Sequence, residues 1–232
     1  AGVNESSWVG PFTFTTPCGS LAPPYLQQFS TWTSTTTLPS CWNEYDSQTP
    51  ATVGSAVPNT ISSWVNDGFG NNAASPYSVT ATVGSASIEL WNLGDSDWLV
   101  SPEFDLSLGG PYQMDFNWVI SNWSSTASEQ IGGDDYVAVM ITTNAGATWA
   151  ELGRYDASTN FPASLLGNEA IYDLTAYAGS VVQIGFWGDE GTIDDPGDVK
   201  FFMDNFQVRP IPTCPKPNSL AVSGITDIDA DV

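Results

Sequence analysis

Histidine is absent from the 232 residues of this chain. Without an imidazole the protein cannot carry a Ser-His-Asp or Cys-His catalytic group, a histidine-based zinc site, or the usual general base near neutral pH. The sequence therefore excludes a large part of hydrolytic enzymology.

Basic residues are almost as scarce, because four Lys and Arg stand against 26 Asp and Glu, giving a formal net charge of −22. Nucleic acids and anionic membrane surfaces are bound through Lys and Arg, so the sequence excludes both as partners. Sulfated and uronic-acid polysaccharides are disfavoured for the same reason, unless a metal bridges them. A divalent cation or a neutral ligand suits this charge balance better.

Cysteine is rare, and no two cysteines have the CxxC spacing of zinc or thioredoxin-type sites. Cys18 and Cys41 could close the segment between them as a disulfide, by analogy with secreted domains. Cys214 is then left over, which suggests a partner in sequence outside these 232 residues. The chain has no run of about 18 apolar residues, and Ala1 does not begin a signal peptide, so we expect part of a mature secreted or cell-surface protein.

Helical periodicity is also nearly absent between residues 21 and 210, where Pro, Gly, Ser, Thr and Asn interrupt the chain repeatedly. Alternating polar and apolar residues instead predict half-buried strands of an all-β sandwich. The clearest strand segments are SIELWNL (87–93), YQMDFNWVI (112–120), YVAVMITT (136–143), VVQIGFWG (181–188) and FFMDNFQV (201–208). TTNAGATW (142–149) predicts a hairpin turn, and YDLTAYAG (172–179) predicts one short helical turn.

The two ends of the chain differ from this interior. SSWVGPFTFTTPCG (6–19) resembles the closing strand of a fibronectin type III module, and residues 211–232 resemble the opening strands of another. We therefore expect three parts: a tail and linker at 1–20, a sandwich domain at 21–210, and a linker with the start of a following module at 211–232.

Several motifs occur in a recognisable order along the interior: LPSCW (38–42), DWLVSPEFDLS (97–107), DDYVAVMITTNAGATW (134–149) and FFMDNFQV (201–208). The series resembles the jelly-roll family that contains MAM domains, cleaved adhesin domains of bacterial surface proteases and choice-of-anchor modules of Bacteroidetes secreted proteins. The resemblance implies a two-sheet antiparallel β-sandwich with frequent calcium and no catalytic residues. It also implies binding of glycans or proteins, or a spacer role, by a monomer.

Acidic residues gather around GDEGTIDDPGDVKFFMDNFQV (188–208). Calcium accepts carboxylate oxygens from irregular loops, and Asp134 and Asp135 open a strand that we expect to share a sheet with 181–188. The predicted calcium ligands are Asp134, Asp135, Asp189, Glu190, Asp198 and Asp204. The alternative is that some of these acids merely solvate loop tips, which is the simpler interpretation of Asp194 and Asp195.

Catalysis by these carboxylates is the least favoured interpretation. A glycosidase needs two carboxylates on either side of a sugar-holding cleft, whereas the adjacent Asp194 and Asp195 of an extended loop would point apart. A polysaccharide lyase would need basic groups that the chain lacks. The terminal DIDAD (227–231) imitates an EF-hand loop but lacks its glycine and closing glutamate.

Ten tryptophans supply the remaining signal. Sugar rings stack on exposed Trp and Tyr side chains, although most tryptophans of a large β-sandwich are expected to be buried in its core. We expect Trp118, Trp123 and Trp187 to contact ligand. The sequence thus predicts a calcium-stabilised, non-catalytic module that binds a neutral polysaccharide; the alternatives are a protein-binding adhesin domain and a ligand-free spacer.

Overall fold

The computed structural model describes residues 18–32, 38–46, 49–50, 53, 64–69, 84–91, 93, 96–159, 168–193 and 197–214. Its elements are β1 (Tyr25–Gln27), β2 (Asn43–Asp46), β3 (Trp64–Asp67), β4 (Ser85–Leu90), β5 (Ser96–Val100), β6 (Phe104–Asp105), β7 (Tyr112–Asn122), β8 (Tyr136–Thr142), β9 (Ala150–Asp156), β10 (Asn168–Asp173), the short 3-10 helix η3 (Thr175–Tyr177), β11 (Val181–Asp189) and β12 (Val199–Pro210). The predicted end modules fall mostly in residues 1–17 and 215–232, outside the described residues.

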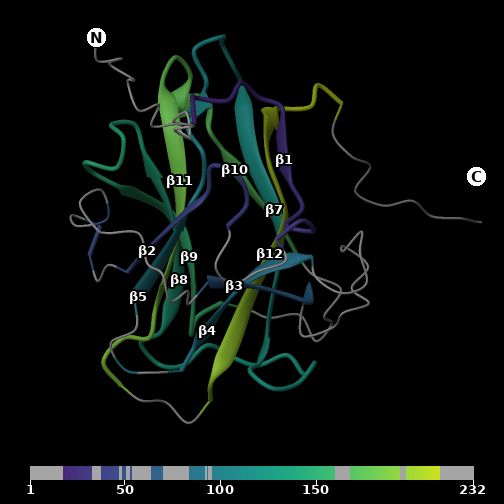
Figure 1. Cartoon of the computed structure of the whole chain (residues 1–232), viewed down its shortest axis with the longest axis vertical. Coiled ribbons are helices and arrows are strands. Elements are labelled where there is room, and N and C mark those ends of the chain that lie inside the picture. Colours follow the sequence, from purple (N-terminus) through teal and green to yellow (C-terminus); the bar gives the residue numbers. More distant parts are fainter. Residues whose placement is uncertain are drawn as a thin grey trace, which may run out of the picture.

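The strands form two layers, seen side by side in Figure 1. The first layer, called the β12 sheet, has the order β10-β7-β12-β4-β3, with β1 also paired to β12. The second, called the β11 sheet, has the order β2-β5-β11-β8-β9, with β6 also paired to β11. All of these strand pairs are antiparallel, which confirms the predicted two-sheet β-sandwich.

The core lies between the two sheets because alternate residues of each strand face inward. Phe201, Met203, Phe206 and Val208 of β12 are all buried, and Phe186 of β11 meets Phe206 edge to face at 5.9 Å. The five segments expected to be strands are β4, β7, β8, β11 and β12, so the alternation pattern predicted them correctly. The helical turn at η3 and the turn between β8 and β9 are confirmed as well.

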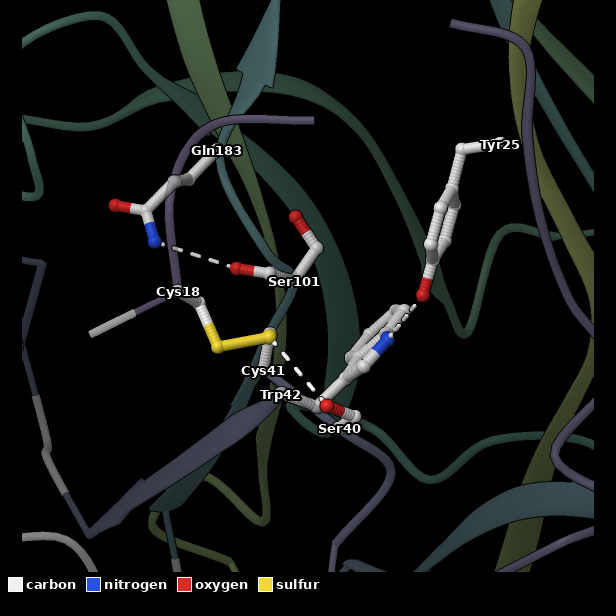
Figure 2. Close-up of a disulfide and its surroundings, with 7 residues drawn as sticks. All are labelled: Cys18, Tyr25, Ser40, Cys41, Trp42, Ser101 and Gln183. Atoms are coloured by element: carbon white, nitrogen blue, oxygen red, sulfur yellow. Dashed lines mark hydrogen bonds between the residues drawn. A yellow bond between two sulfur atoms is a disulfide. The ribbon is translucent and has the colours of Figure 1, made fainter. Parts of the chain in front are cut away.

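The predicted disulfide between Cys18 and Cys41 is present (Figure 2). The bridge joins the segment that leads into β1 to the segment that leads into β2. Next to Cys41, the Trp42 indole N–H donates a hydrogen bond of 3.0 Å to the Tyr25 hydroxyl. Cys214 is a free, exposed thiol.

Among the described residues, no helix is long and apolar enough to cross a membrane.

Candidate functional site

Strand ends bring the predicted acidic residues to one end of the sandwich, called here the acidic pole. Asp189 of β11 and Tyr136 of β8 are paired in register, so these two strands share a sheet, as expected from the sequence, and are direct neighbours in it. Gly188 lies against Ile88 and Leu90 of β4, so that β4 and β11 end at the same pole. The first residues of β8 and β12 and the last residues of β4, β7 and β11 therefore surround this pole.

Asp134 holds the chain that follows β11. Its Oδ2 atom accepts hydrogen bonds from the backbone N–H of Thr192 at 2.7 Å and from the Thr192 hydroxyl at 2.9 Å, while Oδ1 accepts from the N–H of Ile193 at 3.3 Å. These bonds, led by the one from the Thr192 backbone, lower the pKa of Asp134. The ionised carboxylate thus holds this turn through three hydrogen bonds.

Asp189 has a similar structural use. Its Oδ1 accepts from the N–H of Gly191 at 2.8 Å, and its Oδ2 accepts from the Ser96 hydroxyl at 2.9 Å. The same hydroxyl accepts a 2.7 Å hydrogen bond from the Trp187 indole N–H. Asp189 therefore ties β5 and β11 together beneath the turn that Asp134 shapes.

Two of the predicted calcium ligands remain at this pole in buried positions. Asp135 and Glu190 are each 2% exposed, and continuing the Tyr136–Asp189 register by one residue places them opposite one another. Asp135 Oδ1 and Glu190 Oε2 are buried oxygens that make no hydrogen bond to any described residue, and such oxygens can accept a proton or contact a metal. The described residues contain no group of three or more acidic or cysteine side chains able to hold one, which is short of the six to eight oxygens that calcium takes.

Asp204 lies away from the pole. It follows Met203 within β12, about 20 Å along the strand from Asp198 at 3.3 Å per residue. The side chain is 0% exposed, its Oδ1 accepts from the Asn205 N–H at 2.6 Å, and its Oδ2 has no hydrogen-bond partner. Burial raises the pKa of Asp204 to about 8, so the group is a buried neutral acid at neutral pH.

The three tryptophans expected to contact ligand have different surroundings. Trp118 is only 8% exposed and packs in the core at 4.5 Å from the Tyr155 ring, so a ligand cannot stack on it without unpacking the core. Trp187 lies on the outer face of the β11 sheet, stacked at 5.1 Å on buried Trp98. Trp123 is 49% exposed, at the turn that follows β7.

Trp123 has an exposed counterpart in Trp91, which is 54% exposed. The Trp123 N–H donates to the Asp198 carbonyl at 3.2 Å, on one side of β12. On the other side, Leu90 pairs with Val199, so Trp91 follows directly beside Asp198. Trp91, Asp198 and Trp123 form a row across three neighbouring strands, called the tryptophan row, and two strand spacings put the Cα atoms of the two tryptophans about 10 Å apart.

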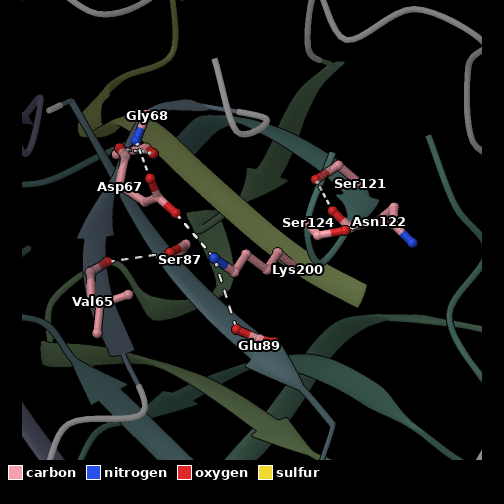
Figure 3. A network of polar contacts seen from close by, with 10 residues as sticks. Val65, Asp67, Gly68, Ser87, Glu89, Ser121, Asn122, Ser124 and Lys200 are labelled. Carbon is pink, nitrogen blue, oxygen red and sulfur yellow. Dashed lines mark hydrogen bonds and ion pairs between the residues drawn. The ribbon is translucent and has the colours of Figure 1, made fainter. Parts of the chain in front are cut away.

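A row of polar side chains lies next to it on the outer face of the β12 sheet (Figure 3). Lys200 extends from β12 between Asp67 and Glu89, with its Nζ atom 3.3 Å from Asp67 Oδ2 and 3.8 Å from Glu89 Oε2. Ser121 lies on the other side of β12. Burial is the main cause that raises the pKa of Glu89; Lys200 lowers it, and the charge of Asp198 raises it further.

A depression with a volume of about 270 Å³ opens beside the acidic pole. Its lining includes Asp134, Asp156, Tyr136 and Arg154, and the Arg154 guanidinium lies over the Tyr136 ring at 4.3 Å from its centroid. Hydrogen bonds from the side chain and backbone of Ser158 lower the pKa of Asp156, as those from Thr192 and Ile193 lower that of Asp134. A general acid near neutral pH needs the opposite shift, so these carboxylates do not form a catalytic pair.

Trp91 and Lys200 were missed by the sequence interpretation, although one signal pointed to Trp91. In SIELWNL, Ile88 and Leu90 face the core, whereas Glu89 and Trp91 lie on the opposite, solvent-facing side. The same rule applied to YQMDFNWVI puts Trp118 with Phe116 and Ile120 in the core. For Lys200, whose partner Asp67 lies 133 residues away, the sequence offers no signal.

Comparison with known proteins assigns no family: no family model matches the chain, and no curated protein is similar to it. Solved structures with a similar arrangement include the K1 cleaved adhesin domain of Lys-gingipain from Porphyromonas gingivalis, at 12% identity and a TM-score of 0.48 over 82% of this chain and 99% of that one. The module TmCBM61 in complex with β-1,4-galactotriose has 12% identity and a TM-score of 0.38, over 74% of this chain and 90% of that one. The non-crystalline cellulose specific carbohydrate-binding module CBM28 has 11% identity and a TM-score of 0.41, over 73% and 87%. Likenesses of this strength assign no ligand to this chain.

Proposed function

We propose that this chain is a non-catalytic, extracellular binding module that takes a neutral polysaccharide on the outer face of its β12 sheet. The observation that carries the proposal is the tryptophan row, in which Trp91 and Trp123 are both about half exposed on either side of Asp198. Large aromatic side chains left at the surface in a pair are costly unless they serve binding. The Cys18–Cys41 disulfide supports an extracellular location.

The chemistry of the row suits a sugar chain. A pyranose presents an apolar C–H face that stacks on an indole and a rim of hydroxyls that needs polar partners. Two tryptophans whose Cα atoms lie about 10 Å apart can contact more than one sugar ring, so the row fits a polymer rather than a monosaccharide. Asp198, Glu89 and Lys200 supply acceptors and a donor for hydroxyl groups along the same face.

Charge supports a ligand without acidic groups. Lys200, the basic residue of this face, is already neutralised by Asp67 and Glu89. The formal net charge of −22 repels polyanions further. We also propose that the module is not catalytic; the depression beside the acidic pole supports this, because the pKa values of its carboxylates Asp134 and Asp156 are lowered and neither suits a general acid.

Structural calcium belongs to the same proposal, with Asp135 and Glu190 as the ligands that fit best. One buried oxygen of each carboxylate, Oδ1 of Asp135 and Oε2 of Glu190, makes no hydrogen bond within the described part of the chain and could contact a bound cation near the ends of β8 and β11. Asp134 and Asp189 would then hold the neighbouring turn rather than the ion, since hydrogen-bond donors already use their carboxylates. Asp204, lying about 20 Å along β12, is not included.

One observation favours a protein partner as the second candidate. Leu93, two residues after Trp91, and Ile193, next to Asp134, are also about half exposed and add aliphatic surface at the acidic pole. Aliphatic side chains do not stack on sugars, whereas protein interfaces combine them with aromatic anchors.

The test is retention of the protein by neutral polysaccharides in affinity electrophoresis, followed by calorimetric titration with oligosaccharides. Trp123→Ala and Trp91→Ala should each weaken binding by about tenfold or more, since a lost stacking contact costs on the order of 1 kcal/mol. Leu108→Ala is the matched control, because Leu108 is 80% exposed and lies in the loop before β7, at the opposite pole. The proposal is wrong if no neutral polysaccharide retards the wild type, or if both tryptophan variants bind as tightly as the Leu108 control.

A further inference from the structure

The tryptophan row has an unusual central residue, because the group between its two indoles is a charged one. Within the described part of the chain, Asp198 interacts through its backbone carbonyl with the Trp123 N–H and through charge repulsion with Glu89. Lys200 contacts Asp67 and Glu89 instead. Asp198 is a partly exposed residue.

The charge of this face is negative even though Lys200 is part of it. Asp67, Glu89 and Asp198 carry three carboxylates against one ammonium group, and the nearness of Asp198 contributes to the raised pKa of Glu89. A ligand that only offers hydroxyl groups leaves this excess charge in place. A ligand that brings a positive charge to Asp198 removes it.

Indole rings on both sides make the same position favourable for a cation. The face of Trp attracts an ammonium group through the ring quadrupole, and a carboxylate adds a charge-assisted hydrogen bond. The combination of an aromatic wall and a carboxylate is a recognition site for an amine held on an otherwise stackable ring. An amino sugar has both of these properties.

We propose that the polysaccharide bound by the tryptophan row carries free amino groups, and that the ammonium group of one sugar binds at Asp198 between Trp91 and Trp123. The inference rests on the proposed function and extends it from neutral sugar chains to chains that also carry amino groups, which bind the same stacking surface more tightly. Hydroxyl-only sugars stack on the same indoles with lower affinity. Uronic-acid polymers are excluded, because their carboxylates would face Asp198 and Glu89.

The experiment compares three β-1,4-linked hexasaccharides by calorimetric titration: glucose, N-acetylglucosamine and glucosamine. At low salt in mild acid, where the amines are charged, the glucosamine hexamer should bind the wild type about tenfold or more tightly than the other two. In mild alkali, where the amines are neutral, the preference should disappear. Asp198→Asn should abolish the preference in acid, so that the glucosamine hexamer binds this variant no more tightly than the glucose hexamer does.

General attraction between a polycation and an acidic protein is the main alternative, and Asp173→Asn controls for it. Asp173 is an exposed carboxylate at the end of β10, on the opposite pole, so its removal changes the net charge by the same amount. The preference for glucosamine must survive in Asp173→Asn and be lost in Asp198→Asn. Equal loss in both variants, or no loss in Asp198→Asn, overturns the inference.

Failure of the inference differs from failure of the proposed function. Equal affinity of the wild type for the glucose and glucosamine hexamers overturns the inference and leaves neutral polysaccharide binding intact. The absence of binding to any of the three, together with no retention by polymers, overturns both.

Discussion

The backbone N–H of Trp123 donates a hydrogen bond of 3.2 Å to the carbonyl of Asp198, which fastens the turn after β7 to the residue that precedes β12. This bond fixes the position of an exposed indole against the start of the longest strand of the sandwich. A binding group placed on a strand pair loses less conformational entropy on binding than one on a free loop. The geometry of the tryptophan row thus follows from backbone pairing among β4, β12 and β7.

Trp118 and Trp123 are five residues apart and should respond to truncation in opposite ways. Trp118→Ala removes a buried ring that contacts Tyr155 and Phe201, so it should lower the free energy of unfolding by about 3–5 kcal/mol. Trp123→Ala should change it by less than about 1 kcal/mol and instead weaken polysaccharide retention. Urea denaturation of both variants separates the two roles; similar destabilisation by both would contradict the surface assignment of Trp123.

Asp204 should make the protein less stable as pH rises. Its folded-state pKa of about 8 lies above the ordinary value of an unfolded aspartate, so the folded state keeps a proton that the unfolded state has released. The contribution of Asp204 to the free energy of unfolding does not change with pH below the unfolded pKa near 4. It falls by about 1.4 kcal/mol per pH unit between the two pKa values and is constant above about pH 8.

Asp204→Asn should remove this slope, because an amide imitates the protonated acid. Denaturant midpoints measured from mild acid to mild alkali should show the variant more stable than the wild type at high pH and similar to it at low pH. Asp173→Asn is again the control, since hydrogen bonds from Thr175 lower the pKa of that exposed carboxylate. A wild-type stability that rises between pH 5 and pH 8, with Asp204→Asn following it in parallel, contradicts the buried neutral acid.

Gly191→Ala tests the turn that Asp134 holds. Gly191 has a φ of +71°, and a Cβ atom there would lie 2.5 Å from Cγ of Asp134. We expect a loss of about 1–3 kcal/mol in the free energy of unfolding, from backbone strain together with displacement of the Asp134 carboxylate. Gly19→Ala serves as the control, since nothing lies within 4 Å of its Cβ position. Equal thermal midpoints for the two variants would show that Asp134 does not hold this turn.

Removal of the disulfide by Cys18→Ser with Cys41→Ser should cost about 3 kcal/mol, mainly because the unfolded chain regains the freedom of the closed loop. Alkylation of the denatured wild type should label Cys214 alone before reduction and all three cysteines after it. Labelling of three thiols without reductant would mean that the bridge does not form.

Calcium at Asp135 and Glu190 predicts a higher thermal midpoint with calcium than with chelator, by several degrees if the ion is bound well above its dissociation constant. Asp135→Asn with Glu190→Gln should abolish this difference, because neutral amides need no counter-ion. An unchanged midpoint in the wild type, together with no ion found by elemental analysis, would exclude the metal.

The fold was largely accessible from the sequence because alternation carries information about burial. Each of the five strands predicted from period-two patterns exists, since a half-buried strand must expose every second residue. The shorter strands β1, β2, β3 and β6 have two to four residues each and carry no usable pattern. Their existence depends on distant partners, such as β12 for β1.

The site was accessible only in part, for the same physical reason. Proximity of Asp134 and Asp189 followed from pairing of β8 with β11, which the sequence suggested. The sequence could not show that Asp134 accepts hydrogen bonds from the backbone N–H groups of Thr192 and Ile193. Every residue except proline has such a group, so residue identity carries no information about this contact. The separation of Asp204 from the acidic pole could have been derived from the sequence, because Asp204 lies in the predicted strand 201–208, where each residue adds about 3.3 Å.

The Cys18–Cys41 bridge determines how the module carries mechanical tension. A pull on the chain from the N-terminal side reaches Cys18 and passes through the sulfur atoms directly to Cys41 and the start of β2. The covalent bond bypasses the intervening segment, which includes β1, so that segment cannot be drawn out until the bond is reduced. The edge of the β12 sheet where β1 pairs with β12 is therefore shielded from load, and the resistance of the domain from this side falls on β2 and its pairing with β5.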